Sequence, residues 1–598
     1  MSNYRRTARL AAVAAVGALV LAACGGGDEG GGGAAPAAGH EFNAAATRIV
    51  NPNDATGGTL RLGGGSDCDS WDPARAYYGA CWNMQRLYAR KLVDFGSFDP
   101  ANATALAPDL ATALGEPNAD FTQFTYHLKD GIKFEDGSPI TSADFKWALK
   151  RLYATDVING GPNSYFLCLL SDCADGVNPD YKGAYKDPSG EPMVKGKPAI
   201  ETPDDKTVIF NLSQPYASFD YLAAMGPLSP IPQKVDETDK GGENYTQNPV
   251  SSGPYKISEY DRDTGITFVR NDQWDQATDT IRKPKVDTVT IEYISNLDDL
   301  DQRLKAGTLD ARFDGDTQPT FQAEQFSDPT LKAHTDNPVD GALSYIVVFP
   351  QNIPNADCRK ALFYGINKVT YLTAFGGTNN GEIAHNLTPA GLPGYDNTID
   401  MYANGADSSG DVAKAKEELA ACGQPDGFDT NLAFVNQGTG PQRAAAIKEA
   451  LARIGVNVDL KPGEAETYYS EYIGSTESVK SNKLGIGLAG WGADFPTTNG
   501  FWFAISHGKA NQKTSDSNYP DLDDPTVNGL MDKALTAPSD QWDQIGKDLD
   551  TALMNAAVFI PMVHSKSVYY RNDRLTNVYS TQFFGLYDWV NMGVSDGA

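Results

Sequence analysis

The sequence lacks the short motifs that accompany several common classes of enzyme active site. It contains no G-x-S-x-G, H-E-x-x-H or phosphate-loop pattern. Its six histidines are scattered without the spacing of metal ligands: His40, His127, His334, His385, His507 and His564. These absences predict a chain without enzymatic activity, bound metal or cofactor. One enzyme class stays open, a secreted glycoside hydrolase, because it needs only two carboxylates and the chain has 77 acidic residues.

Positive charge is also scarce. The chain has 49 Lys and Arg against 77 Asp and Glu, which gives a formal net charge of −28. Such a field repels nucleic acid and anionic membrane surfaces, and it favours solubility and cationic ligands. We therefore expect no nucleic-acid partner. Hydrophobic residues make up 41% of the chain, as in a globular protein.

The apolar run near the N-terminus is too short to span a bilayer. It extends from Leu10 to Leu21 and follows a charged segment with three arginines (Arg5, Arg6 and Arg9), which is the pattern of a signal peptide. The run ends in Leu21-Ala22-Ala23-Cys24, which resembles the bacterial lipoprotein signal. We predict that residues 1–23 are removed and that Cys24 is lipidated. A twin-arginine signal is the weaker alternative, because Thr7-Ala8 after the arginine pair matches it poorly.

A glycine-rich segment follows Cys24. Residues 24–56 read as a flexible tether, which as a random coil would span roughly 30 Å. A lipid anchor and a tether together predict a folded protein held at the outer face of the cell membrane. The expected location is therefore extracytoplasmic, with the lipid as the membrane contact.

The cysteines show no C-x-x-C pair, which argues against a zinc site. Besides Cys24 there are six, an even number that implies disulfides in an exported chain. Six cysteines allow 15 pairings. We predict pairing of nearest neighbours: Cys68–Cys81, Cys168–Cys173 and Cys358–Cys422.

The length of 598 residues exceeds one hydrophobic core and predicts two or more lobes. Residues 121–153 alternate as a strand and then form a helix that starts at Thr141 with Asp144 in a capping box. Residues 431–460 read as strand, helix and strand, with Pro441 in the first turn of the helix. Another helix runs from Val412 to Cys422 with Asp411 as its cap. These patterns predict an α/β protein with mixed or parallel sheets.

Several segments together resemble the family 5 extracellular solute-binding proteins, the peptide and nickel receptors of ABC importers. The segment FTQFTYHLKDGIKFEDGSPITSADFKWALKRL, residues 121–152, carries the family pattern in order. Residues 59–74, 249–255 and 358–368 resemble three further family segments. The resemblance covers about residues 57–590. It implies a two-lobed periplasmic-binding-protein-like fold, a monomer, and as partners a membrane permease with its separate ATPase subunits.

The same resemblance implies the division of the chain. Lobe one would hold residues 57–294, with an inserted subdomain at about 95–210, and also the C-terminal residues 563–598. Lobe two would hold residues 295–562, with the crossings near Ser295 and Met562.

The candidate ligand site follows a strand at Leu484 to Leu488, in which every second residue is glycine. Such spacing suits close approach of another backbone. In the peptide receptors of this family a Trp-x-x-Asp segment lies in the cleft, and Trp491-Gly492-Ala493-Asp494 matches it. The resemblance implies that Asp494 pairs with a peptide ammonium and that Gly490, Trp491 and Ala493 lie beside an extended ligand.

Other candidate residues and other functions remain open at this point. Tyr77 and Tyr78 lie where the family lines its pocket, although core packing explains each equally well. Arg359 and Arg443 are two of several candidates for a ligand carboxylate. Within the family the solute could instead be a nickel chelate, an opine or a sugar. Outside the family, two other functions are open. A glycoside hydrolase would turn over glycosides, and an adhesin would lack a closing cleft.

Overall fold

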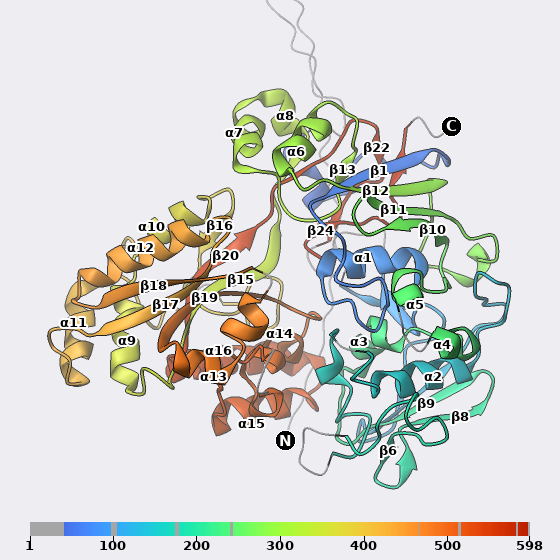
Figure 1. Cartoon of the computed structure of the whole chain (residues 1–598), viewed down its shortest axis with the longest axis horizontal. Helices are drawn as coiled ribbons and strands as arrows, with labels where there is room; N and C mark the ends of the chain where they lie inside the picture. Colours follow the sequence, from blue (N-terminus) through green and yellow to red (C-terminus); the bar gives the residue numbers. More distant parts are fainter. Residues whose placement is uncertain are drawn as a thin grey trace, which may run out of the picture. The chain divides into compact units, whose positions relative to one another are not determined.

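A computed structural model describes most of the chain (Figure 1). The described residues are 41–96, 104–158, 160–173, 179–239, 243–396, 398–465, 467–511, 516–581 and 584–595. The predicted signal peptide, Cys24, His40 and the first part of the predicted tether lie outside them. No helix in the described ranges is both long and apolar enough to cross a bilayer.

The first large sheet has five strands and mixes parallel with antiparallel pairs. Its order is β10 (Tyr255–Asp261), β11 (Gly265–Arg270), β12 (Thr288–Tyr293), β1 (Thr59–Gly64) and β13 (Ala311–Arg312). β1 runs parallel to both of its neighbours, β12 and β13. Helix α1 (Gly79–Tyr88) follows the loop after β1, and its buried residues join the core of this sheet.

The second large sheet has six strands, which lie side by side in Figure 1. Their order is β16 (Gly381–Ile383), β20 (Phe559–Lys566), β15 (Val339–Val348), β19 (Leu484–Gly492), β17 (Asp429–Val435) and β18 (Asn457–Gly463). β17, β18 and β19 are parallel to one another, whereas β15 pairs antiparallel to β19 and β20. Residues Leu484 to Ala489 of β19 are all buried, so both faces of this strand are covered.

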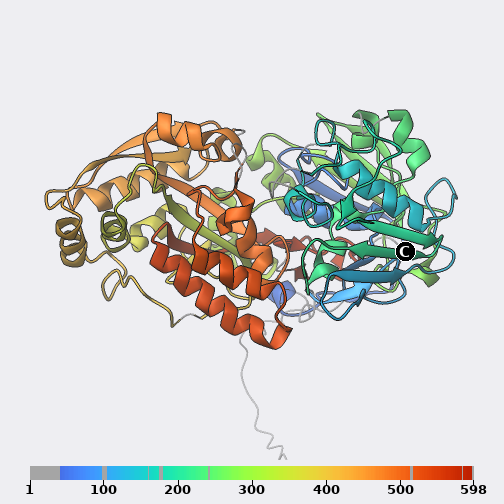
Figure 2. The same cartoon turned by 90° about the horizontal axis from the view of Figure 1, so that it is seen from below.

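Helices cover this second sheet. α12 (Gly440–Ala452) packs on β17 and β18, and α10 (Lys368–Phe375) packs on β16 and β20. α14 (Thr498–Ser506), α15 (Pro525–Ala534) and α16 (Trp542–Ala556) contact one another and appear together in orange and red in Figure 2. The predicted strand, helix and strand at 431–460 are β17, α12 and β18, and this prediction is confirmed.

A smaller sheet joins β4 (Glu116–Pro117), β5 (Gln123–His127), β9 (Thr207–Asn211) and β8 (Ile200–Asp204). Helix α2 (Ser142–Leu152) packs beside it, and the Asp144 carboxylate accepts hydrogen bonds from the Thr141 backbone N–H and hydroxyl. We propose that these elements form the inserted subdomain expected at about 95–210. Their buried residues belong to one hydrophobic core, which also includes Phe495 and Leu535 of the second half of the chain.

The fold class is confirmed as a two-lobed α/β architecture with mixed sheets. For the lobes themselves we propose boundaries from strand pairing. β13 pairs with β1, and the chain enters the second sheet at Val339 and leaves it at Lys566. We therefore use "first lobe" for the described residues of 41–338 and 567–595, and "second lobe" for those of 339–566. These boundaries lie later than the crossings expected near Ser295 and Met562. The first lobe also begins before residue 57, because Ala44, Ala45 and Val50 of the predicted tether are buried in its core.

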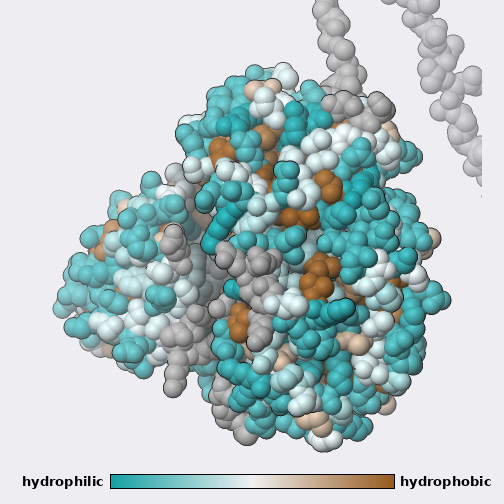
Figure 3. All heavy atoms as spheres, turned by 45° about the vertical axis from the view of Figure 1, so that its right-hand side comes forward, coloured by the Kyte–Doolittle hydropathy of each residue, from teal (hydrophilic) through white to brown (hydrophobic). Residues whose placement is uncertain are grey.

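All three predicted disulfides are confirmed. Cys68–Cys81, Cys168–Cys173 and Cys358–Cys422 close loops with sequence separations of 13, 5 and 64 residues. The third joins α9 (Ala356–Gly365) to the end of α11 (Val412–Ala421), and the Asp411 side chain caps α11 as predicted. On the face shown in Figure 3, apolar side chains lie in small separate patches among hydrophilic ones.

Candidate functional site

The site is built on the loop that joins β19 to α14. Thr497 caps α14, because its hydroxyl oxygen accepts a hydrogen bond of 3.1 Å from the Gly500 N–H. The Asp494 N–H donates to the Gly500 carbonyl at 2.9 Å. These two bonds fix the backbone at Asp494, so the position of its carboxylate is set by the second lobe.

The Asp494 carboxylate meets two tyrosines of the first lobe. The Tyr77 and Tyr165 hydroxyls donate to its Oδ2 atom at 3.0 and 2.5 Å. Tyr77 precedes α1, and Tyr165 ends the short 3-10 helix Asn163–Tyr165. The contact therefore joins three segments that are far apart in the sequence.

Asp494 is buried without a compensating charge. It is 8% exposed, and no ion pair reaches it from the described residues. Burial raises its pKa from 3.8 to about 7, and the two tyrosine hydrogen bonds only partly oppose that rise. A carboxylate in this state can accept a cation, because an ammonium group would supply the missing charge.

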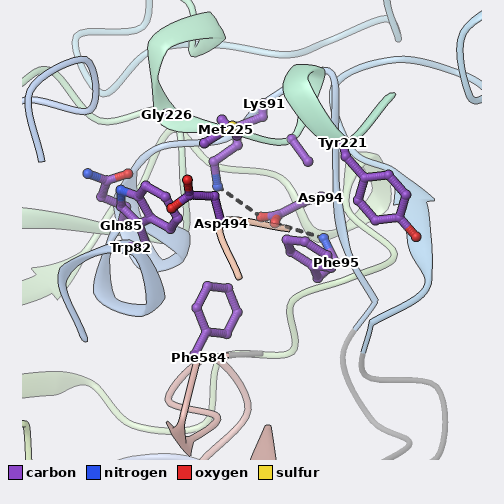
Figure 4. Close-up of a pocket in the computed structure, with 11 residues that line it drawn as sticks. Trp82, Gln85, Lys91, Asp94, Phe95, Tyr221, Met225, Gly226, Asp494 and Phe584 are labelled. Atoms are coloured by element: carbon purple, nitrogen blue, oxygen red, sulfur yellow. Dashed lines mark hydrogen bonds and ion pairs between the residues drawn. The ribbon is translucent and has the colours of Figure 1, made fainter. Parts of the chain in front are cut away.

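A small cavity lies beside Asp494 (Figure 4). Its volume is about 20 Å³, which is room for about one water molecule. Its walls are Trp82, Gln85, Lys91, Asp94, Phe95, Tyr221, Ala224, Met225, Gly226, Asp494 and Phe584. With the lobes in contact as they are here, a ligand can enter only if these walls move.

Gln85 is a second buried polar residue in the wall of this cavity. It is 1% exposed, and neither its amide oxygen nor its amide nitrogen has a hydrogen-bond partner among the described residues. Such an amide costs free energy unless a water or a ligand group satisfies it. Lys91 is different, because its ammonium lies 3.4 Å from the Asp94 carboxylate, which also accepts from Arg282 at 2.7 Å. The Lys91 ammonium is therefore already paired with a carboxylate.

Among the described strands, the last part of β19 is paired on one side only, which leaves its other edge free. Its pairing with β17 ends at Gly487, whereas its pairing with β15 continues to Gly492. Gly490 and Gly492 are exposed. On the free side, the Leu488 carbonyl accepts a hydrogen bond of 2.8 Å from the Tyr468 hydroxyl. The residues after Leu488 can therefore accept another extended chain alongside.

The structure brings some of the predicted site residues together and separates others. Tyr77 and Asp494 are in contact. Trp491 lies nearby, but its indole N–H donates to the Phe501 carbonyl at 2.7 Å, within its own lobe. Tyr78 is 60% exposed at the start of α1. Ala493 is half-buried in the loop before Asp494.

Sequence reasoning missed Tyr165 and Gln85. Tyr165 stands in an irregular segment, and no local pattern marks it. Gln85 carried a weak signal, because it lies one helical turn after the buried Cys81 and next to the buried Met84. No group of three or more His, Cys, Asp or Glu residues in the described ranges is placed to hold a metal ion.

Comparison with known proteins identifies the family. Residues 105–513 match the profile of the bacterial extracellular solute-binding proteins, family 5, middle region. The chain belongs to this family. The solved structure of clavulanic acid biosynthesis oligopeptide binding protein 2 is 36% identical, covers 94% of this chain and 99% of its own, and has a TM-score of 0.88.

Relatives in the family carry names for different ligands. The oligopeptide-binding protein OppA of Bacillus subtilis is 27% identical over 64% of this chain, and the alignment spans 66% of OppA, just under two thirds. Heme-binding protein A of Haemophilus influenzae is 25% identical over 83% of this chain and 85% of that protein. Both names describe binding proteins and neither describes an enzyme. The family therefore fixes the class of protein, and the site must indicate the ligand.

Proposed function

We propose that this protein is the receptor of an ABC importer and that it captures oligopeptides between its two lobes. The observation that carries the proposal is the buried Asp494 carboxylate, which has no charged partner among the described residues and which both lobes enclose beside a free strand edge. A peptide offers an ammonium group for the carboxylate and an extended backbone for the edge. Relatives with peptide-binding names support the same solute class.

Binding would begin with the peptide backbone alongside Gly490 and Gly492. Main-chain hydrogen bonds of this kind read no side chains, so one receptor can accept many sequences. The peptide ammonium would then replace the proton that burial holds on Asp494. An ion pair away from water is strong when its geometry is good, and the two tyrosine hydroxyls keep the carboxylate in place.

Closure of the two lobes would distinguish the ligand-bound receptor from the free one. A ligand that touches both lobes favours the closed form, because only that form offers both sets of contacts. The closed receptor would dock on a membrane permease whose ATPase subunits are separate chains. The protein would act as a monomer held to the outer face of the cell membrane by a lipid on Cys24. Replacement Cys24→Ser should release it from the membrane fraction, and mass spectrometry of Cys24 should detect the lipid.

Calorimetry with tetra-alanine and N-acetyl-tetra-alanine tests the peptide proposal. We expect the free amine to bind and the acetylated peptide to bind about tenfold to 100-fold more weakly, because it has no charge to pair with Asp494. Asp494→Asn should remove this difference. Glu449→Gln, an exposed acid on α12, is the matched control and should keep it.

Two results would contradict the proposal in different ways. Equal affinity for the free and the acetylated peptide would remove Asp494 from the site. If neither peptide bound, mass spectrometry of solutes that co-purify with the protein would identify the alternative, such as a nickel chelate, an opine or a sugar.

A further inference from the structure

Two disulfides of the first lobe lie on the segments that carry the tyrosines of the site. We call Cys68–Cys81 the first bridge and Cys168–Cys173 the second bridge. Tyr77 lies inside the loop that the first bridge closes, and Tyr165 lies just before the second bridge. Both tyrosine hydroxyls donate to the Asp494 carboxylate. Each of these two hydrogen bonds therefore comes from a segment that a disulfide restrains.

The first bridge supports a segment without regular secondary structure. All of residues 65–78 are described, and none of them belongs to a helix or strand. Cys81 lies in α1 and is buried, as is Cys68, so the bridge joins the start of this segment to a helix of the core. Next to Cys68, the Asp69 carboxylate accepts a hydrogen bond of 2.7 Å from the Tyr77 N–H. The backbone of Tyr77 is thus held beside the bridge.

The Tyr77 ring is oriented by Trp82, the residue after Cys81. The two ring centres lie 5.6 Å apart, and the Trp82 indole N–H donates to the Ala76 carbonyl at 2.8 Å. Both contacts require a fixed spacing between α1 and the loop before it. The first bridge fixes that spacing covalently, so it determines where the Tyr77 hydroxyl lies.

The second bridge attaches the turn with Tyr165 to the rest of the first lobe. The Ser213 hydroxyl, just after β9, donates to the Cys168 carbonyl at 2.6 Å. On the other side of the bridge, the Asp172 N–H donates to the Met193 carbonyl at 2.7 Å. The disulfide joins these two points of attachment, and Tyr165 lies directly before them. The position of its hydroxyl therefore depends on this turn.

The remaining disulfide, Cys358–Cys422, provides a contrast. We call it the third bridge, and it joins α9 to the end of α11 in the second lobe. Both helices are described in full, and neither supplies a hydrogen bond to the Asp494 carboxylate. Its sequence separation is 64, against 13 and 5 for the first and second bridges, so in the chain-entropy model its removal lowers stability the most. The third bridge therefore measures the effect of a disulfide on stability alone.

We propose that the first and second bridges are positioning groups for ligand capture, which hold the two tyrosine hydroxyls at the Asp494 carboxylate. This inference rests on the proposed function. The hydroxyls stabilise the ionised carboxylate that pairs with the ligand ammonium, and a donor that is held in place loses little freedom when it bonds. Without its bridge, the tyrosine lies on a less restrained segment and makes the hydrogen bond only part of the time. The preference of the receptor for a free amine therefore depends on both bridges.

The test uses the full-length protein and calorimetry with tetra-alanine and N-acetyl-tetra-alanine. Cys68→Ala/Cys81→Ala and Cys168→Ala/Cys173→Ala should each reduce the ratio of the two affinities about threefold to tenfold, the effect of losing one hydrogen bond. Removal of both cysteines of a bridge leaves no free thiol behind.

Tyrosine variants that keep every bridge provide the reference. Tyr77→Phe and Tyr165→Phe should reduce the same ratio by a similar factor. In a double-mutant cycle, Tyr77→Phe should cause little further loss when the first bridge is already absent, because the bridge acts through that hydroxyl. The same holds for Tyr165→Phe and the second bridge.

The pH dependence of binding separates positioning from structural support. The tyrosine hydrogen bonds oppose the rise of the Asp494 pKa, so their loss should raise that pKa further. The midpoint of free-amine binding should then move to higher pH by about half a unit to one unit. Lys91 and Asp94, the other charged groups in the wall of the cavity beside Asp494, pair with each other and are the same in every variant. A disulfide that affects only stability moves no midpoint.

Cys358→Ala/Cys422→Ala is the matched control, because it removes the third bridge. It should lower the melting temperature at least as much as the other two pairs of substitutions and leave the free-amine preference and the midpoint unchanged. If a variant of the first lobe does not fold, a phosphine reductant can open the bridges in the folded protein, and mass spectrometry of alkylated cysteines then shows which ones are open.

Two sets of results contradict the inference in distinguishable ways. A preference and a midpoint that stay unchanged when the first and second bridges are open, or additive losses in the double-mutant cycle, overturn the positioning role and leave peptide binding in place. Failure of both peptides to bind the unmodified protein, or equal affinity for them, overturns the proposed role of Asp494 and this inference together.

Discussion

Burial of the Asp494 carboxylate lowers the stability of the protein, because a charged carboxylate without a neighbouring cation loses its hydration. Burial raises its pKa to about 7, and a proton on the carboxyl group below that pH removes part of the desolvation cost. The tyrosine hydroxyls that bond it would also stabilise an ionised carboxylate when a cation arrives. The same acid therefore suits both an empty and an occupied site.

Replacement Asp494→Asn should flatten the dependence of stability on pH. Between about pH 4 and 7 the folded protein holds a proton on Asp494 that the unfolded chain loses, so the free energy of unfolding falls as the pH rises. A shift from 3.8 to about 7 corresponds to about 4 kcal/mol over that range. Denaturant unfolding at pH 4 and pH 8 measures the change, and an equal change in the asparagine variant would contradict it.

Gln85 gives an independent test at the residue scale. Its amide has no partner, so Gln85→Leu should raise the free energy of unfolding by about 1 kcal/mol while it weakens peptide binding. Gln325 is the control, because it is equally buried but bonds to Thr317 and Thr335. Gln325→Leu should lower stability by about 1–3 kcal/mol. Thermal and chemical unfolding of both variants decide the point, and a destabilised Gln85→Leu would show that the amide has a structural role.

At the scale of elements, the glycines of β19 serve two purposes. A Cβ atom at Gly485 would lie 1.9 Å from the Thr430 hydroxyl oxygen, whereas one at Gly490 would lie 3.6 Å from the Leu343 carbonyl oxygen, an ordinary contact. The first glycine is required by packing within the sheet. The second is exposed, so the fold does not require it.

The two positions should respond differently to a side chain. Gly485→Ala should lower the free energy of unfolding by about 1–3 kcal/mol, because Thr430 must move. Gly490→Val should leave stability within about 0.5 kcal/mol of the parent but weaken peptide binding, because its side chain stands beside the free edge. Unfolding curves and calorimetry on the same preparations separate the effects. Unchanged peptide affinity in Gly490→Val would place the ligand elsewhere.

The sequence best predicted the features that depend on residues close together in the chain. Capping residues predicted the starts of α2 and α11, and nearest-neighbour pairing predicted the three disulfides. The alternating glycines predicted a strand at Leu484 to Leu488; the strand is confirmed but extends to Gly492, so Trp491 lies within it and Asp494 lies in the loop beyond. Tyr165 could not be predicted in this way, because it meets Asp494 across 329 residues of sequence and through the packing of two lobes. Local patterns carry no information about such a contact.

At the scale of the whole molecule, the loop after β19 connects the two lobes through side-chain contacts. Phe495 joins the hydrophobic core around the small sheet, with ring-centre distances of 5.3 Å to Tyr165 and 5.9 Å to Tyr221. The Ala217 N–H adds a hydrogen bond of 2.6 Å to the Leu535 carbonyl. In the described conformation the two lobes are thus in contact at this loop, and the Asp494 carboxyl group is buried between them.

Closure without ligand should therefore depend on pH. When the lobes separate, water reaches Asp494 and its pKa returns toward 3.8, so opening releases a proton between about pH 4 and 7. Raising the pH over that range should favour the open form by about tenfold per unit. Small-angle scattering without ligand should then give a larger radius of gyration at pH 8 than at pH 5, and Asp494→Asn should abolish the difference.

A bound peptide should reverse this dependence, because its ammonium keeps Asp494 ionised in the closed form. Binding at pH 6 should then release a proton, which calorimetry detects as a heat that differs between phosphate and imidazole buffers, and affinity should rise from pH 5 to pH 7. N-acetylated peptide provides the control, since without its charge it should release no proton. A heat independent of buffer for the free peptide would mean that Asp494 is already ionised in the closed protein, and the link between its burial and ligand capture would fail.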